Sequence, residues 1–251
     1  MQTRSKTRTE INYIRESGKM LATILNHLII STKVGMSTND IARIAEKELQ
    51  KLGGKPAFLG YQNFPDVLCV SINDEVVHGI PKKDKIIHDG DIVSLDFGVN
   101  YGGMITDAAK SVVIGDNIDK KILNLVKNTE IALYKGISVL HSGVRTGDIG
   151  YAIESELNKN HYGVVRDLVG HGVGHFLHED PNIPNYGRKN TGPWLYKNMT
   201  IAIEPMTTLG RGEVKLASDN WTILTMDGSL SAHFEHTVLI TENGFEIITE
   251  I

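Results

Sequence analysis

Residues 35–49, GMSTNDIARIAEKEL, recur 108 positions later in the chain as residues 143–157, GVRTGDIGYAIESEL. Seven of the 15 aligned positions are identical. Each copy has the pattern of a helix: a threonine, then an acid in the first turn, then apolar residues at helical spacing. We expect Thr38 and Thr146 to be the N-caps of these two helices. Amphipathic segments precede both copies, at about residues 11–31 and 118–140.

The same offset aligns two strand patterns, DIVSLDFG (91–98) and MTIAIEPM (199–206), and places Asp96 on Glu204. Chance similarity between two capped helices is the alternative explanation, but a carboxylate at an unchanged offset argues against it. The repeat predicts a duplicated α/β fold with pseudo-twofold symmetry, built from helix–helix–strand halves. We expect one domain over residues 1–251, with halves at roughly 11–115 and 118–251 and a site where they meet.

Composition excludes several classes of protein. The 251 residues carry 26 Lys+Arg and 30 Asp+Glu, a net charge of -4, and 41% are hydrophobic, so neither a disordered chain nor a nucleic-acid-binding protein is indicated. The single cysteine, Cys69, suits a reducing compartment. No secretory signal is visible, and the apolar stretch 20–30 is too short to span a bilayer. We therefore expect a soluble cytoplasmic protein without membrane or nucleic-acid partners.

A predicted hairpin brings two aspartates together. Strand 91–99 leads through NYGG (100–103) into a second strand pattern at 104–114. If Tyr101-Gly102 is the two-residue turn, Asp96 lies directly opposite Asp107. Two carboxylates at that range, roughly 4.5–5.5 Å between Cβ atoms, repel each other unless a proton or a cation is bound between them.

The second half offers a matching pair, Glu204 and Glu235. Their spacing of 31 residues, against 11 for the aspartates, predicts about twenty more residues of loop in the second hairpin. Four acids from two equivalent hairpins would suit two divalent cations. A surface coincidence is the alternative, but Asp96 is embedded in an apolar strand.

Histidine supplies a further type of ligand. Residues 170–181, GHGVGHFLHEDP, contain His171, His175 and His178. A zincin needs H-E-x-x-H on a helix, and Gly172 and Gly174 disfavour a helix here. An imidazole among four carboxylates favours Mn(II), Fe(II), Co(II) or Zn(II) and a hydrolytic centre, and one cysteine excludes a thiolate-bound structural zinc site.

Six ordered motifs resemble those of the methionine aminopeptidases: VVHGIP, SLDFG, ITDAA, GHGVG, AIEPM and FEHTV. The similarity runs from about residue 10 to the end of the chain. It implies a pita-bread fold, an α+β domain with a central antiparallel sheet. It also implies removal of the initiator methionine from nascent proteins with a small second residue, through a hydroxide bridging two divalent metal ions. The five metal ligands implied are Asp96, Asp107, His171, Glu204 and Glu235.

Further roles follow from the same resemblance. Glu204 would also be the general base, His178 would contact the scissile amide, and His78 would contact the substrate backbone or leaving group. The methionine pocket would comprise Phe58, Tyr61, Phe64, Cys69, Leu177 and Trp221. Phe58, Phe64 and Leu177 depart from common family residues, and Phe58 is expected to narrow the pocket. The family also suggests a monovalent-cation site near Asn73, Glu75 and Ser231.

The spacing from His171 to Glu204 leaves no room for the insertion of type II members, and only about ten residues precede the catalytic unit, so the chain resembles the short bacterial type I enzymes. Expected partners are nascent N-termini and, transiently, the ribosome, and we expect a monomer. Two alternatives remain open at this point: an X-Pro aminopeptidase or prolidase, which usually carries an additional N-terminal domain, and a catalytically inactive binding module of the same fold.

Overall fold

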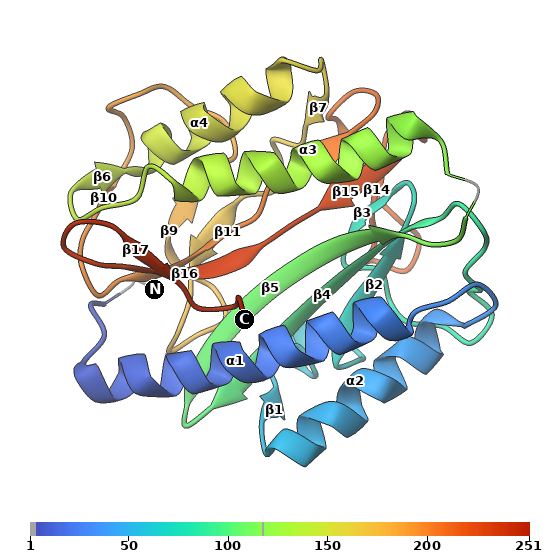
Figure 1. Cartoon of the computed structure of the whole chain (residues 1–251), viewed down its shortest axis with the longest axis horizontal. Coiled ribbons are helices and arrows are strands. Elements are labelled where there is room, and N and C mark those ends of the chain that lie inside the picture. The colour runs from blue at the N-terminus through green and yellow to red at the C-terminus, as the bar shows by residue number, and fades with distance from the viewer. Residues whose placement is uncertain (1–3, 117) are drawn as a thin grey trace.

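The structure, a computed structural model, describes residues 4–116 and 118–251 (Figure 1). In the view of Figure 1, one pair of helices lies in the lower part of the molecule and the other pair in the upper part, with strands between the two pairs. The helices are α1 (Arg8–Ser31), α2 (Thr38–Leu52), α3 (Lys120–Ile137) and α4 (Thr146–Asn158). They match the two predicted helical pairs in order and type.

The predicted caps of α2 and α4 are wrong by one residue. Ser37 caps α2, because its Oγ accepts the Asp40 N–H at 3.1 Å while the Asp40 carboxylate accepts the Ser37 N–H at 2.9 Å. Thr38 is the first helical residue, and its hydroxyl is bonded to Lys82 instead. In α4 the N-cap is Arg145, whose backbone is extended, so this helix likewise begins one residue later, at Thr146.

The strands form antiparallel sheets, two of which matter most here. In the first, β4 pairs with β5 on one edge and with β1 and β2 on the other. The second has the order β17-β16-β11-β8-β9. Their bounds are β1 (Lys55–Pro56), β2 (Leu68–Ile72), β4 (Ile92–Tyr101), β5 (Met104–Val113), β8 (Gly170–Gly172), β9 (Glu179–Ile183), β11 (Thr200–Ile203), β16 (His236–Ile240) and β17 (Phe245–Ile247).

Shorter strands and one 3-10 turn complete the chain. The turn η1 (Tyr61–Asn63) lies between β1 and β2. The remaining strands are β3 (Glu75–Val77), β6 (Val144–Arg145), β7 (Gly163–Val164), β10 (Trp194–Leu195), β12 (Met206–Thr208), β13 (Val214–Leu216), β14 (Ile223–Thr225) and β15 (Ser231–His233). The predicted extra loop of the second hairpin is thus largely occupied by β12 to β15.

The register of the first hairpin differs from the predicted one by two residues. Tyr101 pairs with Met104, so the turn is Gly102-Gly103, and both glycines have positive φ, at 59° and 83°. Glycine adopts this conformation without the steric penalty that Tyr101 would incur. Asp96 therefore pairs with Ala109 rather than with Asp107. Because the shift is two residues, both aspartates remain on the same face, as diagonal neighbours.

The second hairpin keeps one register across an interruption. Ile203 pairs with His236 in the ladder of β11 and β16, and Met206 pairs with His233 in that of β12 and β15. Glu204 and Glu235 lie between the two ladders, at positions that continue the same register. The glutamates thus face each other directly, whereas the aspartates are offset.

The two halves join along β5, against β15 and β16. The Glu235 N–H donates to the Ala109 carbonyl at 2.8 Å. The Thr237 hydroxyl accepts the Asp107 N–H at 2.9 Å and donates to the Asp107 carbonyl at 2.8 Å. This seam fixes the ligand-bearing strand of one half against that of the other.

Each half has its own apolar core between its helices and its sheet. In the first half, side chains such as Leu25 and Ile41 pack against Leu95 and Phe97 of β4. In the second, Leu133 and Ile153 belong to the cluster that packs on the sheet. Within the described residues, no helix is both long and apolar enough to cross a membrane.

We expect Thr237→Val to lower the free energy of unfolding by about 1–3 kcal/mol, because it preserves shape but leaves two buried backbone groups of Asp107 without partners. Urea denaturation of the manganese-loaded protein would measure the change. Thr23→Val, on the exposed face of α1, is the matched control. Equal stability of the two variants would contradict a stabilising role for this contact.

Candidate active site

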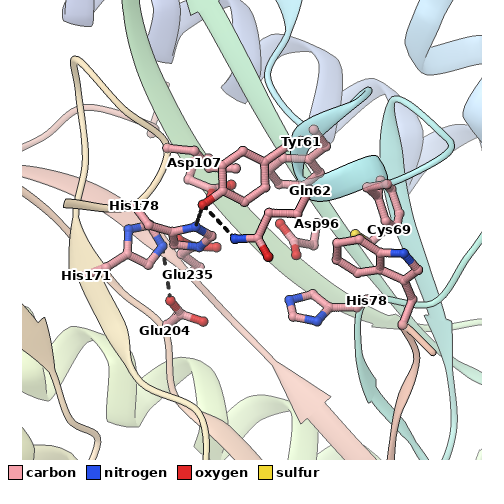
Figure 2. A pocket seen from close by; sticks show the side chains of 14 residues that line it. Tyr61, Gln62, Cys69, His78, Asp96, Asp107, His171, His178, Glu204 and Glu235 are labelled. Carbon is pink, nitrogen blue, oxygen red and sulfur yellow. Dashed lines mark hydrogen bonds and ion pairs between the residues drawn. The ribbon is translucent and has the colours of Figure 1, made fainter. Parts of the chain in front are cut away.

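A cavity of about 210 Å³ lies between the two halves (Figure 2). Its lining includes all thirteen residues singled out from the sequence as catalytic, metal-binding or substrate-binding, together with Gln62. The lining residues are Phe58, Tyr61, Gln62, Phe64, Cys69, His78, Asp96, Asp107, His171, Leu177, His178, Glu204, Trp221 and Glu235. The structure therefore brings the predicted set together.

Carboxylates and an imidazole occupy one end of the cavity. Asp96 comes from β4, Asp107 from β5 and His171 from β8, while Glu204 follows β11 and Glu235 precedes β16. All five are at most 9% exposed. Ligand atoms of Asp107, His171 and Glu235 lie within 4.8 Å of one another, a spacing that suits a bound metal ion.

Burial makes the ionised form of every acid in this cluster unfavourable. It raises the pKa of Asp107 to about 7 and, with the charge of Asp107 as a second cause, raises the pKa of Asp96 well above its ordinary value. The pKa values of Glu204 and Glu235 are raised well above the ordinary range by burial first and by the neighbouring carboxylates second. Either protons or cations must compensate this charge.

The donor atoms present fit a divalent cation. Among the described residues, buried oxygens of Asp96, Asp107 and Glu235 have no hydrogen-bond partner, and unsatisfied buried carboxylate oxygens are costly unless an ion binds them. The Nδ1 of His171 lies 2.9 Å from the Gly172 carbonyl, so it carries the proton and leaves the Nε2 lone pair available. Oxygen-rich donors with one imidazole suit the transition metals predicted from the sequence.

Aromatic side chains build the other end of the cavity. The rings of Phe58 and Phe64 meet edge to face at 6.4 Å, and Phe64 and Trp221 meet likewise at 5.1 Å. Cys69 is buried beside them, and burial raises the pKa of its thiol, so this end is uncharged. It forms an apolar chamber next to the acidic cluster.

Two histidines lie between these ends. His78 packs edge to face on Trp221 with centroids 6.1 Å apart, and burial lowers its pKa to about 4. His178 contacts His171, with ring centroids 4.2 Å apart, and burial also lowers its pKa. Both are therefore neutral near pH 7 and able to donate or accept a hydrogen bond.

His175, the third histidine of the glycine-rich segment, lies outside the cavity lining. The His175 Nε2 is 2.8 Å from the Glu10 carboxylate, and the His175 backbone N–H donates to the Glu179 carboxylate. Glu179 also pairs with Lys6 at 2.8 Å, and both side chains are buried. The chain before α1 is thereby tied to the segment that carries Leu177 and His178.

Sequence reasoning missed three features of this site. Nothing in the pattern marks Gln62, which reaches the site through the turn η1, or the Lys6–Glu179 pair, whose members lie 173 positions apart. His233 was detectable: it precedes Glu235 by two residues, which places it on the same side of the chain. Its Nε2 lies 3.7 Å from Glu204, opposite His171, whose Nε2 is 3.4 Å from the same carboxylate.

The residues suggested for a monovalent-cation site are neighbours in the structure. The Ser231 N–H donates to the Asn73 carbonyl at 2.8 Å, and its hydroxyl lies within hydrogen-bond distance of the Asn73 and Glu75 carbonyls. The cation itself remains a prediction from the resemblance.

Comparison with known proteins identifies the class. The sequence model of metallopeptidase family M24 matches residues 12–242. The methionine aminopeptidase of Clostridium acetobutylicum is 46% identical over 97% of both chains, and methionine aminopeptidase 1 of Bacillus subtilis is 44% identical over 98% of both. The crystal structure of the Thermotoga maritima methionine aminopeptidase superposes with a TM-score of 0.97, at 44% identity and full coverage of both chains.

The fold and the acid–imidazole cluster are accordingly those of a pita-bread metallopeptidase. The chain belongs to family M24 and, within it, to the methionine aminopeptidases. The predicted fold class is confirmed.

We expect the affinity of the metal-free protein for Mn(II) to rise at least tenfold between pH 6 and pH 8. The carboxyls with raised pKa values, including Asp107 at about 7, retain protons at the lower pH, and the cation must displace them. By the same linkage, the contribution of Asp107 to the stability of the metal-free fold is present below about pH 4 and is lost as the pH rises through 7. Calorimetry in buffers of different ionisation enthalpy would measure the protons released.

Glu235→Gln removes one of these carboxylates and should reduce both proton release and affinity. Glu213→Gln, at an exposed position, is the matched control. Affinity independent of pH, with no proton release, would exclude these carboxyls as the binding groups.

Proposed function

We propose that the protein removes the initiator methionine from the N-termini of nascent proteins whose second residue is small. The observation that carries this proposal is the direct adjacency of a buried acid–imidazole cluster and an apolar chamber in one cavity. A methionine side chain in the chamber would place its own α-amino group and peptide bond beside the acids. The names of the full-length relatives support the same substrate.

The metal centre would use the donors Asp96, Asp107, His171, Glu204 and Glu235. Two divalent ions bound there would act as Lewis acids, polarising the scissile carbonyl and acidifying water. The paired carboxylates from equivalent strands support two ions. Which of Fe(II), Mn(II), Co(II) or Zn(II) serves is a matter of availability as well as affinity.

Glu204 is the general base in this proposal. Its carboxylate lies 3.4 Å from the Nε2 of His171 and 3.7 Å from the Nε2 of His233, so it borders two imidazoles as well as the other acids. It would take a proton from the attacking water and deliver it to the departing amine nitrogen. The raised pKa of Glu204 in the metal-free protein reflects burial beside other acids, and bound cations would restore its basic form.

His178 and His78 would contact the substrate on its reacting side. His178 would donate a hydrogen bond to the scissile carbonyl oxygen, and that bond would strengthen as negative charge develops there. His78, which packs edge to face on Trp221, would contact the backbone of the departing peptide. Both groups remain neutral at pH 7, which suits hydrogen bonding rather than charge pairing.

The apolar chamber would bind the methionine side chain. Its lining comprises Phe58, Tyr61, Phe64, Cys69, Leu177 and Trp221. Burial of a thioether there is worth roughly 1.5–3 kcal/mol, and contacts between sulfur and aromatic rings add to it. The Phe58 ring occupies the position that a side chain at Gly98 would take, so it packs directly on the backbone of β4.

We also infer a single catalytic domain over residues 1–251, with halves at roughly 11–115 and 118–251. Two observations support a single domain of two halves. Hydrogen bonds join β5 of the first half to β15 and β16 of the second, and both halves contribute residues to the site. The protein would act in the cytoplasm as a monomer that meets nascent chains at the ribosome, without direct contact with nucleic acid. The substrate class and the lone cysteine support that setting.

The decisive measurement is release of methionine from Met-Ala-Ser by metal-stripped protein reconstituted with Mn(II), Fe(II) or Co(II). Glu204→Gln should lower kcat by about 10²–10⁴-fold, the range for loss of a general base. Glu213→Gln should leave kcat unchanged. Met-Leu-Ser should be cleaved more slowly than Met-Ala-Ser, because the larger second residue clashes beyond the chamber.

Met-Pro and Ala-Pro peptides test the alternative specificity. Preferential cleavage of Ala-Pro would assign the protein to the X-Pro class and overturn the proposal. Stoichiometric metal binding with no release from any peptide would instead indicate a binding module.

A further inference from the structure

Three side chains form a hydrogen-bonded chain at the mouth of the cavity. Figure 2 shows Gln62 reaching from η1 to Tyr61, and Tyr61 reaching to His178. The Gln62 Nε2 lies 3.2 Å from the Tyr61 hydroxyl, and that hydroxyl lies 2.7 Å from the His178 Nδ1. The rings of Tyr61 and His178 are also in contact, with centroids 5.2 Å apart.

The position of each proton in this chain follows from the donor inventory. An amide nitrogen only donates, so the Tyr61 oxygen accepts from Gln62. With that bond made, the one hydroxyl proton of Tyr61 is available to the His178 Nδ1, which accepts it in the arrangement that uses every donor once. A neutral imidazole that accepts at Nδ1 carries its own proton at Nε2.

We propose that Gln62 and Tyr61 are positioning residues that hold His178 in its Nε2–H tautomer, so that this N–H donates to the substrate. The inference rests on the proposed function, because it supplies the donor that the scissile carbonyl oxygen requires. Neither residue need touch the reacting atoms. Gln62 acts through Tyr61, and Tyr61 acts through the imidazole.

The neighbouring histidine is held in the opposite state. The His171 Nδ1 donates to the Gly172 carbonyl, which leaves its Nε2 as a lone pair. The two histidines, whose rings are in contact, therefore differ at Nε2: His171 has a lone pair there and His178 has an N–H. One suits a cation and the other an oxygen that gains negative charge.

The backbone of the turn supports a positioning role for Gln62. Gln62 and Asn63 have φ values of 47° and 71°, a left-handed conformation that asparagine tolerates but that is disfavoured for glutamine. Such strain persists where surrounding structure imposes it, typically at functional sites. Here hydrogen bonds from the Phe64 N–H to the Tyr61 carbonyl, at 2.8 Å, and from the Gly60 N–H to the Phe64 carbonyl, at 2.9 Å, close the turn.

A spectroscopic test reads the tautomer directly. Long-range ¹H–¹⁵N correlation spectra of the zinc-loaded protein, labelled with ¹⁵N-histidine and recorded at pH 8, distinguish the two neutral forms of His178. We expect the Nε2–H form in the unmodified protein. Gln62→Glu replaces the donor by an acceptor of equal size, so the Tyr61 hydroxyl should turn toward it and His178 should adopt the Nδ1–H form.

Two further variants keep the test specific. Asn63→Asp adds the same charge one residue away and should leave the Nε2–H form in place. Tyr61→Phe removes the link and should yield a mixture of tautomers. An Nδ1–H form in the unmodified protein, or an unchanged tautomer in Gln62→Glu, would overturn the inference.

Kinetics with Met-Ala-Ser connects the tautomer to the reaction. Gln62→Glu should lower kcat at least tenfold with less than a threefold change in KM, whereas Asn63→Asp should change neither by more than twofold. A switched tautomer with unchanged kcat would overturn the donation to substrate. Failure of the unmodified protein to release methionine would instead overturn the proposed function, and the spectra would still report the tautomer.

Discussion

The mutual repulsion of four buried carboxylates is the constraint on which the rest of this structure depends. Asp96, Asp107, Glu204 and Glu235 are confined to one cavity, where burial and neighbouring charge penalise ionisation. Such a cluster cannot drive folding, since removing charges from water costs several kcal/mol for each group. The two apolar cores and the hydrogen-bonded seam must therefore hold the acids in place. This explains why the ligand positions lie on or next to strands of paired sheets, where the backbone is least free to separate them.

Duplication supplies the two pairs of acids, but the pairs are not geometrically equivalent. In the second hairpin the register places Glu204 directly opposite Glu235, whereas Asp96 and Asp107 are diagonal neighbours. Diagonal positions on a sheet are roughly 7–8 Å apart, against about 4.5–5.5 Å for opposite ones. The two pairs of acids therefore differ in the spacing that the backbone sets between them. Glu204 is also flanked by two imidazoles, so the pseudosymmetric fold produces one acid whose surroundings differ from those of the other three.

Much of this arrangement could be predicted from the sequence, and the failures have identifiable physical causes. The internal repeat predicted the helical pairs, and the ordered motifs predicted thirteen of the fourteen residues that line the cavity. The first hairpin was predicted two residues out of register because NYGG allows two turns, and only Gly102-Gly103 places glycine at both positive-φ positions. The helix caps were misassigned by one residue because Ser37 and Thr38 are both good caps, and tertiary contacts with Lys82 engage the threonine. Gln62 and the Lys6–Glu179 pair carry no local signal, since they depend on contacts between distant segments.

The acids lie on or beside strands, and part of the apolar chamber lies on a turn. This division explains where specificity for the bound side chain can change without loss of the metal-binding acids. The acids sit on or beside sheet strands, and their geometry is coupled to both cores, so substitutions there disturb the fold and the site together. Phe58, Tyr61 and Phe64 come instead from one short segment around a closed turn, with left-handed residues at its end. This segment contributes to the apolar chamber and, through Tyr61, restrains His178. A substitution in it can alter the size of the chamber, but any shift of the turn also moves the Tyr61 hydroxyl. Recognition of the side chain and orientation of the catalytic imidazole are therefore coupled through a single turn, whereas the acids are carried on or beside strands outside that turn.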